Sequence, residues 1–154
     1  MMTENPLLKE ILQKTCKYCS RGEKSEFEVR NYIQKNFDIP NEDTTFVIKE
    51  LVSQDFINPE RYVKAFINDK LKFNKWGKIK IISELKTKNI DKKIIAKYID
   101  QIDQSEYLSI LQQLLKNKKK QLAGKDEYLQ KASLIRFGLS RGFEYDDIKK
   151  VFNE

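Results

Sequence analysis

Apolar side chains recur along most of the chain at intervals of three and four residues, the spacing that places them on one face of an α-helix. Leu8, Ile11 and Leu12 begin one such stripe, and Ile95 and Ile99 belong to another. Alternation with a period of two, bounded by turn residues, is scarce, so we expect no sheet. The pattern predicts an all-α protein with helices at about residues 5–21, 25–36, 43–55, 59–75, 78–88, 92–102, 105–122, 126–140 and 145–153.

Two of these helices begin with recognisable capping residues. Ser25 and Glu28 have the spacing of a capping box, in which each side chain bonds a free backbone N–H of the first helical turn. Asn58 precedes Pro59, and this order is typical of an N-cap residue followed by proline at the first helical position.

The chain also repeats itself at a distance of 53 residues. Lys35–Asp38 aligns with Lys88–Asp91 and with Arg141–Glu144, a pattern of basic, small or polar, apolar and acidic residues. Asn or Gly at the second position suits a left-handed residue after a helix, and the acid suits the start of the next one. The repeat predicts three tandem three-helix repeats, at residues 1–57, 58–104 and 105–154, stacked into an elongated, curved solenoid-like array. A single globule of nine helices is the competing architecture.

Composition excludes several classes of enzyme. There is no His, so no Ser-His-Asp triad, no Cys-His pair and no imidazole metal site can form. Neither of the glycine-rich phosphate-binding motifs, GxGxxG and GxxxxGK[ST], occurs. We therefore expect a protein that is not an enzyme and that has no catalytic residues, cofactor, metal ion or small-molecule substrate.

Cys16 and Cys19 form a CxxC pair that could be a redox motif or two small core residues. The pair lies late in a predicted helix, on its apolar side, whereas a redox motif occupies a helix N-terminus that lowers the thiol pKa. Core thiols are therefore favoured. No apolar run approaches the roughly 18 residues that span a membrane, and the N-terminus has no signal-peptide pattern. We expect reduced thiols in a cytoplasmic monomer without a membrane partner.

The net charge of +7 is distributed unevenly along the chain. Residues 1–57 carry 8 basic and 10 acidic side chains, residues 58–110 carry 12 and 7, and residues 111–154 carry 10 and 6. The positive charge of the later segments favours an anionic partner.

The best-placed cations lie on the predicted helix that begins at Pro59 and on the residues after it. Helical spacing places Arg61, Lys64, Lys72 and Lys75 on a stripe beside the apolar one. The candidate partner- or DNA-binding residues are Arg61, Lys64, Lys72, Lys75, Lys78, Lys80 and Lys88. The alternative interpretation is that these lysines form a solvated face without a partner. For Arg61, the alternative is an ion pair with an acid of a neighbouring helix such as Glu84.

Three blocks of sequence resemble the bacterial recombination regulator family RecX. They are Ser20–Ser25 (SRGEKS) with Glu28 and Val29 after it, Phe56–Tyr62 (FINPERY) and Trp76–Ile90 (WGKIKIISELKTKNI). The third block is the most specific, because its glycine, acid, leucine and lysine spacings all agree with the family pattern. The chain departs from that pattern at Gly22, Pro59, Val63 and Asn89.

The resemblance implies three tandem three-helix repeats without catalytic activity. It also implies binding to the recombinase RecA assembled as a filament on single-stranded DNA. The usual result is inhibition of ATP hydrolysis, strand exchange and coprotease activity, or promotion of filament disassembly. Direct contact with single-stranded DNA is expected to be weak or absent. The residues interpreted as repeat-forming are Trp76, Gly77, Glu84, Leu85 and Ile90. Of these, we expect Trp76 to pack at a corner between helices and Gly77 to adopt a turn conformation closed to other residues.

Two other functions fit an all-α basic protein. One is a helical DNA-binding module of helix-turn-helix type that binds DNA without RecA and with a steep salt dependence. The negative charge of the first repeat and the lack of a helix rich in base-reading side chains argue against it. The other is a helical-repeat adaptor for a different acidic protein, which would share the fold and change the partner.

Overall fold

The computed structural model describes residues 4–152, and within this range it contains nine α-helices and no strand. The helices are α1 (Pro6–Ser20), α2 (Glu26–Asn36), α3 (Asn41–Ser53), α4 (Pro59–Lys72), α5 (Lys78–Lys86), α6 (Lys92–Ile99), α7 (Gln104–Lys120), α8 (Glu127–Ser140) and α9 (Tyr145–Phe152). The prediction of an all-α chain is confirmed.

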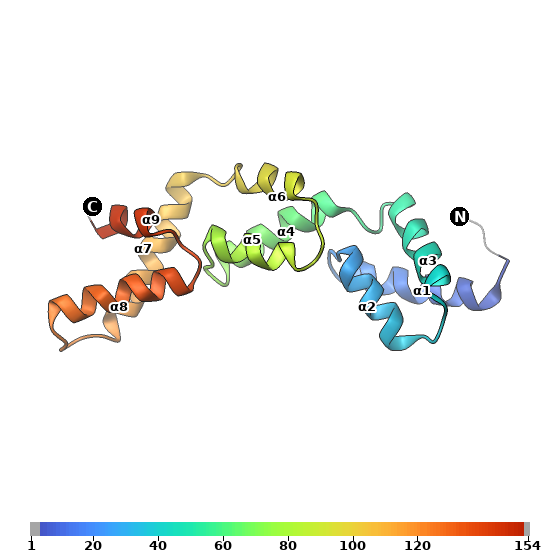
Figure 1. Cartoon of the computed structure of the whole chain (residues 1–154), viewed down its shortest axis with the longest axis horizontal. Helices are drawn as coiled ribbons and strands as arrows, with labels where there is room; N and C mark the ends of the chain where they lie inside the picture. Colours follow the sequence, from blue (N-terminus) through green and yellow to red (C-terminus); the bar gives the residue numbers. More distant parts are fainter. Residues whose placement is uncertain (1–3, 153–154) are drawn as a thin grey trace.

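The helices form three groups of three that follow one another along the longest axis of the molecule (Figure 1). We call α1–α3, α4–α6 and α7–α9 the first, second and third repeats. The predicted elongated array is therefore confirmed, and the nine-helix globule is wrong. No helix within residues 4–152 combines the length and the apolar character that crossing a membrane requires.

The cores of the three repeats are joined unequally. The first repeat has its own cluster of buried side chains, which includes Val29, Ile33 and Leu51. The second and third repeats share one continuous cluster, in which Leu85 of α5 and Leu111 of α7 are both fully buried. The second and third repeats therefore fold around a common core, and the first repeat packs around a separate one.

The predicted capping residues lie at the helix starts. The Asn58 side chain accepts hydrogen bonds from the backbone N–H groups of Glu60 and Arg61, at 3.0 and 3.1 Å. Ser25 Oγ accepts from the Glu28 N–H at 3.1 Å, which is one half of the predicted capping box. The Glu28 carboxylate turns away from its own helix and accepts a hydrogen bond from the Tyr62 hydroxyl of the second repeat.

The turn that follows the second helix is left-handed in two of the three repeats. Asn89 and Gly142 have φ values of 57° and 94°, as the repeat pattern predicts. The prediction is wrong for Asn36, which is the last residue of α2 and is followed by the extended residue Phe37. Residues 37–40 join α2 to α3, and because both Phe37 and Pro40 are extended, the chain leaves α2 without the tight turn.

The helix from Pro59 is shorter than predicted. It ends at Lys72 instead of residue 75, and Phe73 is its C-cap. Lys75 has a φ of 54°, and the Trp76 N–H bonds back to the Lys70 carbonyl oxygen at 3.0 Å. Lys75 therefore lies in the corner after α4 and not on the helical stripe that the sequence predicts.

Two glycines form the backbone contact between the second and third repeats. The Gly77 N–H donates to the Arg141 carbonyl oxygen at 2.7 Å, and the Ile79 N–H donates to the Gly142 carbonyl oxygen at 3.0 Å. A Cβ atom on Gly77 would lie 2.3 Å from the carbonyl carbon and oxygen of Gly142. Gly77 has a φ of −80° and a ψ of 169°, so the predicted special turn conformation is wrong. Glycine is needed here because two backbones touch.

Candidate partner-binding groove

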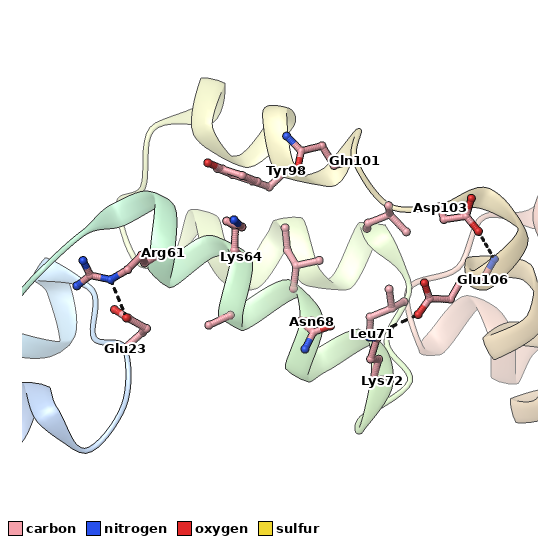
Figure 2. A pocket seen from close by; sticks show the side chains of 13 residues that line it. Glu23, Arg61, Lys64, Asn68, Leu71, Lys72, Tyr98, Gln101, Asp103 and Glu106 are labelled. Atoms are coloured by element: carbon pink, nitrogen blue, oxygen red, sulfur yellow. Dashed lines mark hydrogen bonds and ion pairs between the residues drawn. The ribbon is translucent and has the colours of Figure 1, made fainter.

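A solvent-open groove of about 620 Å³ runs along α4, and α6, the segment after it and the start of α7 form its other side (Figure 2). Its apolar lining comes from Ile67 and Leu71 of α4, both buried, and from Ile102 between α6 and α7. The apolar stripe that predicted the helix therefore also supplies the floor of the groove.

Charges of both signs surround this floor. Lys72 Nζ lies 3.7 Å from Glu106 Oε1, and Figure 2 shows the two side chains pointing toward each other. Lys64 Nζ lies 5.7 Å from the centre of the Tyr98 ring. Asp103 also lines the groove, where it caps α7 by accepting from the Glu106 N–H at 3.0 Å. The rim therefore combines two lysines with two carboxylates.

Arg61 lies at the end of the groove, where its guanidinium group bonds to two acidic side chains. Its Nε donates to Glu23 Oε1 at 2.8 Å, and its Nη1 donates to Asp55 Oδ2 at 2.7 Å. Its Nη2 donates to the backbone oxygen of Asp55 at 2.7 Å. Arg61 thus forms a structural ion pair, as the alternative interpretation predicts, but Glu84 is the wrong partner because both acids come from the first repeat and the segment after α3. Arg61 therefore links the first repeat to the second.

The ionisation of these groups follows from their contacts. The hydrogen bond to Glu23 and the nearby charge of Asp55 hold the pKa of the Arg61 guanidinium above its usual value. The Asn58 amide, which donates to Asp55 at 3.1 Å, and the charge of Arg61 hold the pKa of Asp55 below its usual value. Arg61 and Asp55 therefore both favour the charged, paired form.

Four of the predicted cations lie outside the groove. Lys88 is half-buried and approaches Glu28 to 3.6 Å across the boundary of the first and second repeats. Lys78 Nζ lies 4.7 Å from the centre of the Tyr107 ring, and Lys80 Nζ lies 4.6 Å from that of Trp76. Lys75 is in the corner after α4. The structure thus places Arg61, Lys64 and Lys72 along the groove, and the other four do not line it.

The residues interpreted as repeat-forming lie mostly inside the second repeat. Leu85 is fully buried, Ile90 packs against the shared core, and Glu84 is half-buried on α5. Trp76 packs against the same core with its ring at an edge-to-face angle to Phe66, 6.5 Å between centroids. The position of Trp76 between α4 and α5 agrees with the predicted corner.

Sequence reasoning missed Tyr98, which lines the groove, and the acid that holds its hydroxyl. Glu60 accepts hydrogen bonds from Lys97 Nζ and from the Tyr98 hydroxyl, both at 2.8 Å. These two donors hold the pKa of Glu60 below its usual value. The partners are 37 and 38 residues away in sequence, so no local spacing could have indicated the network. A complete repeat alignment could have found Tyr98, since it belongs to the same helical stripe as Ile95 and Ile99.

The two cysteines belong to the core of the first repeat. Cys19 is buried, and Cys16 is half-buried and packs against the same cluster. Burial raises the pKa of the Cys19 thiol to about 11 and also raises that of Cys16. Both thiols are therefore protonated near neutral pH, and the geometry agrees with core packing better than with redox chemistry.

Replacing Arg61 with Gln is expected to lower the urea midpoint of unfolding near neutral pH, because Glu23 and Asp55 lose their shared partner. The lowered pKa of Asp55 means that its contribution is present above the usual value of 3.8 and is lost as the pH falls through the folded-state pKa. The difference between Arg61→Gln and the wild type should therefore be largest near neutral pH and shrink in acid. Circular dichroism during urea unfolding at several pH values measures it.

The matched control for this change is Lys14→Gln. Lys14 forms an ion pair with Glu10 at 3.0 Å within α1, and both side chains are more than half exposed. A surface pair of this kind contributes little to stability. Equal effects of the two substitutions, or a difference that persists unchanged in acid, would show that Arg61 does not join the repeats.

Comparison with known proteins shows that the chain is similar to one family. Models described as the second and third three-helix domains of RecX match residues 59–99 and 105–152. The chain is 31% identical over 110 residues to "Regulatory protein RecX" of Finegoldia magna, covering 68% of this chain and 52% of that protein. It is 32% identical over 143 residues to the protein of the same name from Clostridium botulinum, covering 90% and 65%. The chain thus spans about half to two thirds of the length of these relatives.

Solved structures show the same fold. A crystal structure of RecX from Lactobacillus salivarius superposes with a TM-score of 0.82 at 18% identity, covering 95% of this chain and 94% of that one. A second, titled "Crystal structure of regulatory protein RecX", gives a TM-score of 0.86 at 16% identity and covers 96% and 72%. At these identities the likeness concerns the fold alone.

Proposed function

The chain belongs to the RecX family of regulatory proteins, and from this premise we propose that it binds the RecA filament on single-stranded DNA and lowers its activity. The affected activities are ATP hydrolysis, strand exchange and coprotease action. The protein acts in the cytoplasm as a monomer and without catalysis. The observation that carries this proposal is the match of two RecX family models to consecutive three-helix repeats, over residues 59–99 and 105–152.

We further propose that the groove along α4 is where the filament protein is contacted. An apolar floor with a polar rim is typical of protein interfaces. Glu106 lies beside Lys72, and Asp103 and Lys64 line the same groove, so the rim offers complementary positions to both acidic and basic side chains of a partner. A nucleic-acid backbone carries only negative charge and would be repelled by these two carboxylates.

The test measures DNA-stimulated ATP hydrolysis by the cognate RecA while the protein is added in increasing amounts. The wild type should lower ATP turnover and should bind RecA–DNA filaments more tightly than bare DNA. The double variant Lys64→Glu/Lys72→Glu should weaken filament binding by about tenfold or more, because it removes two rim cations and places a like charge beside Glu106. Arg61 is left unchanged in this variant, since it holds the first repeat.

The matched control is Lys92→Glu/Lys93→Glu, which reverses two exposed cations at the start of α6, outside the groove. It should inhibit as the wild type does, and circular dichroism should show equal helix content in all three proteins. No effect of the wild type on ATP turnover or filament stability at any stoichiometry would refute the proposal. Tight binding to bare DNA that RecA does not improve would instead support the helix-turn-helix alternative.

A further inference from the structure

The two boundaries between repeats are built in a similar way. At each one, a tyrosine at the fourth position of a first helix bonds the start of the preceding middle helix. The Tyr62 hydroxyl of α4 bonds Glu28 in the first turn of α2. The Tyr107 hydroxyl of α7 accepts the N–H of Lys78, the first residue of α5. The same boundary geometry therefore occurs twice within the chain.

Opposite charges cross both boundaries at matching positions. Arg61, the third residue of α4, pairs with Glu23, which follows α1. Glu106, the third residue of α7, pairs with Lys72 at the end of α4. A first helix thus brings a charge near its start to an opposite charge near the end of the preceding first helix.

The turn after the middle helix also contacts the preceding repeat. Lys88 lies after α5 and approaches Glu28 of α2 to 3.6 Å. Arg141 lies after α8, and its carbonyl oxygen accepts the N–H of Gly77, the N-cap of α5. In both cases a basic residue after one middle helix meets the start of the preceding middle helix.

The third repeat carries the same kinds of surface, and no other repeat within residues 4–152 covers them. Lys119 and Lys120 are exposed at the end of α7, and Glu127 is exposed at the start of α8. Lys119 and Glu127 line one cavity of about 280 Å³, so these two helix ends lie together. Next to Glu127, Tyr128 and Leu129 have 77% and 55% of their surfaces exposed. Adjacent exposed apolar side chains indicate an interaction surface.

The first repeat carries complementary groups. Figure 1 shows the start of α1 and the connection between α7 and α8 at opposite ends of the longest axis. Glu4 precedes the N-cap of α1, Leu7 in its first turn is 52% exposed, and Lys35 is exposed in the last turn of α2. By the boundary geometry, Glu4 matches the lysines at the end of α7, and Lys35 matches Glu127.

The net charges of the two ends favour the same pairing. Residues 1–57 hold 8 basic and 10 acidic side chains, whereas residues 111–154 hold 10 and 6. Surfaces of opposite charge attract each other, and two like ends repel. A second copy of the chain, placed head to tail, therefore matches both ends.

We propose that copies of this chain associate head to tail, with the first repeat of one copy against α7 and α8 of the next. The contact joins two different surfaces, so it extends into open arrays and does not close at a dimer. The fourth residue of α1 is Lys9 and not tyrosine, and Asn36 lacks the left-handed turn found at Gly142. The contact is therefore weaker than the internal boundaries, and the chain is a monomer in dilute solution.

The first experiment measures mass against concentration by sedimentation equilibrium of the whole chain, without RecA or DNA. The average mass should start at the monomer at low micromolar concentration and pass beyond the dimer as the concentration approaches millimolar. Added salt should reduce the association, because the charged groups at both ends are exposed and are screened.

The second experiment exchanges the charges of one proposed pair. Lys35→Glu and Glu127→Lys each place like charges at the contact and should weaken association about tenfold. The double variant Lys35→Glu/Glu127→Lys has the net charge of the wild type and should recover the association. Lys93→Glu is the matched control, at an exposed position on α6 away from both ends, and should associate as the wild type does.

The third experiment removes the aromatic side chain from α8. Tyr128→Ala should weaken association about fivefold or more, as for an aromatic side chain truncated in an interface. Phe73→Ala is the matched control, because Phe73 is 79% exposed and belongs to the second repeat. It should associate as the wild type does, and circular dichroism should show equal helix content in all variants.

Four results would overturn the head-to-tail contact. A mass that stays at the monomer would leave the two ends to a different partner, and a mass that levels off at the dimer would indicate a symmetric contact. The third is a double exchange that does not recover what the single changes lose. The fourth is an equal effect of Tyr128→Ala and Phe73→Ala. Because RecA is absent from every sample, failure here leaves the proposed function intact.

Discussion

Replacing Gly77 with Ala is expected to lower the free energy of unfolding by about 3 kcal/mol, the upper part of the range for overpacked positions. The added methyl group would lie 2.3 Å from the Gly142 carbonyl carbon and oxygen and 2.4 Å from the Phe143 nitrogen. These are backbone atoms, so no side-chain rotation relieves the clash. The second and third repeats would have to move apart and give up the hydrogen bond from Gly77 to Arg141. Urea unfolding followed by circular dichroism measures the loss.

Two other glycines separate the effect of the clash from the effect of backbone conformation. Gly124 has a φ of 88° and open space around it, so Gly124→Ala should cost only about 1 kcal/mol of conformational strain. Gly142 has a φ of 94°, and a Cβ atom there would lie 2.4 Å from the Lys80 Cβ atom. Gly142→Ala combines both problems and should be at least as damaging as Gly77→Ala. A Gly77→Ala protein as stable as Gly124→Ala would contradict the observed backbone contact.

Replacing Tyr107 with Ala is expected to lower the free energy of unfolding by about 4 kcal/mol, as for other large aromatic side chains truncated in a core. Tyr107 is fully buried in the core shared by the second and third repeats, with its ring 5.2 Å from that of Phe143. Its hydroxyl accepts the Lys78 N–H at 2.9 Å, at the start of α5. One side chain of α7 therefore fills the core and also bonds the free end of a helix in the preceding repeat. Thermal or urea unfolding measures the effect.

Tyr107→Phe isolates the hydroxyl contribution from the packing. It keeps the ring and removes only the acceptor of the Lys78 N–H, so a loss of about 1 kcal/mol is expected. Tyr128→Ala removes an equally large side chain that is 77% exposed and should change stability by less than about 0.5 kcal/mol. If Tyr107→Ala were no worse than Tyr107→Phe, the ring would not be packing the two repeats together.

The helices and their starts can be predicted from the sequence because interactions between residues close in the chain determine them. The helical stripes, the Asn58–Pro59 start and the left-handed Asn89 all depend on residues within one or two turns. The end of α4 cannot be predicted in this way. Lys72 and Lys75 continue the basic spacing, and only the backbone bond from Trp76 to Lys70 shows that the helix has already ended.

The candidate sites depend on contacts between repeats, which spacing along the chain does not encode. Arg61 reads equally well as a partner contact or as a structural cation until Glu23, 38 residues away, is found beside it. Glu28 has the position of a capping-box acid, yet its carboxylate bonds Tyr62, 34 residues away. Gly77 matches the family motif, but the reason for glycine there is an approach to Gly142 that no pattern indicates.

Because the buried side chains form two separate clusters, we expect the molecule to bend at one boundary, that between the first and second repeats. Between the second and third repeats a continuous core and the Gly77–Arg141 hydrogen bond resist bending. Polar contacts join the first and second repeats, namely Arg61 with Glu23 and Glu28 with Tyr62 and Lys88. Polar links at partly exposed positions weaken as salt rises, whereas a shared apolar core does not. We therefore expect the second and third repeats to move as one stiff unit and the first repeat to change its orientation relative to them. The molecule would then adapt to a helical filament only at the boundary between the first and second repeats.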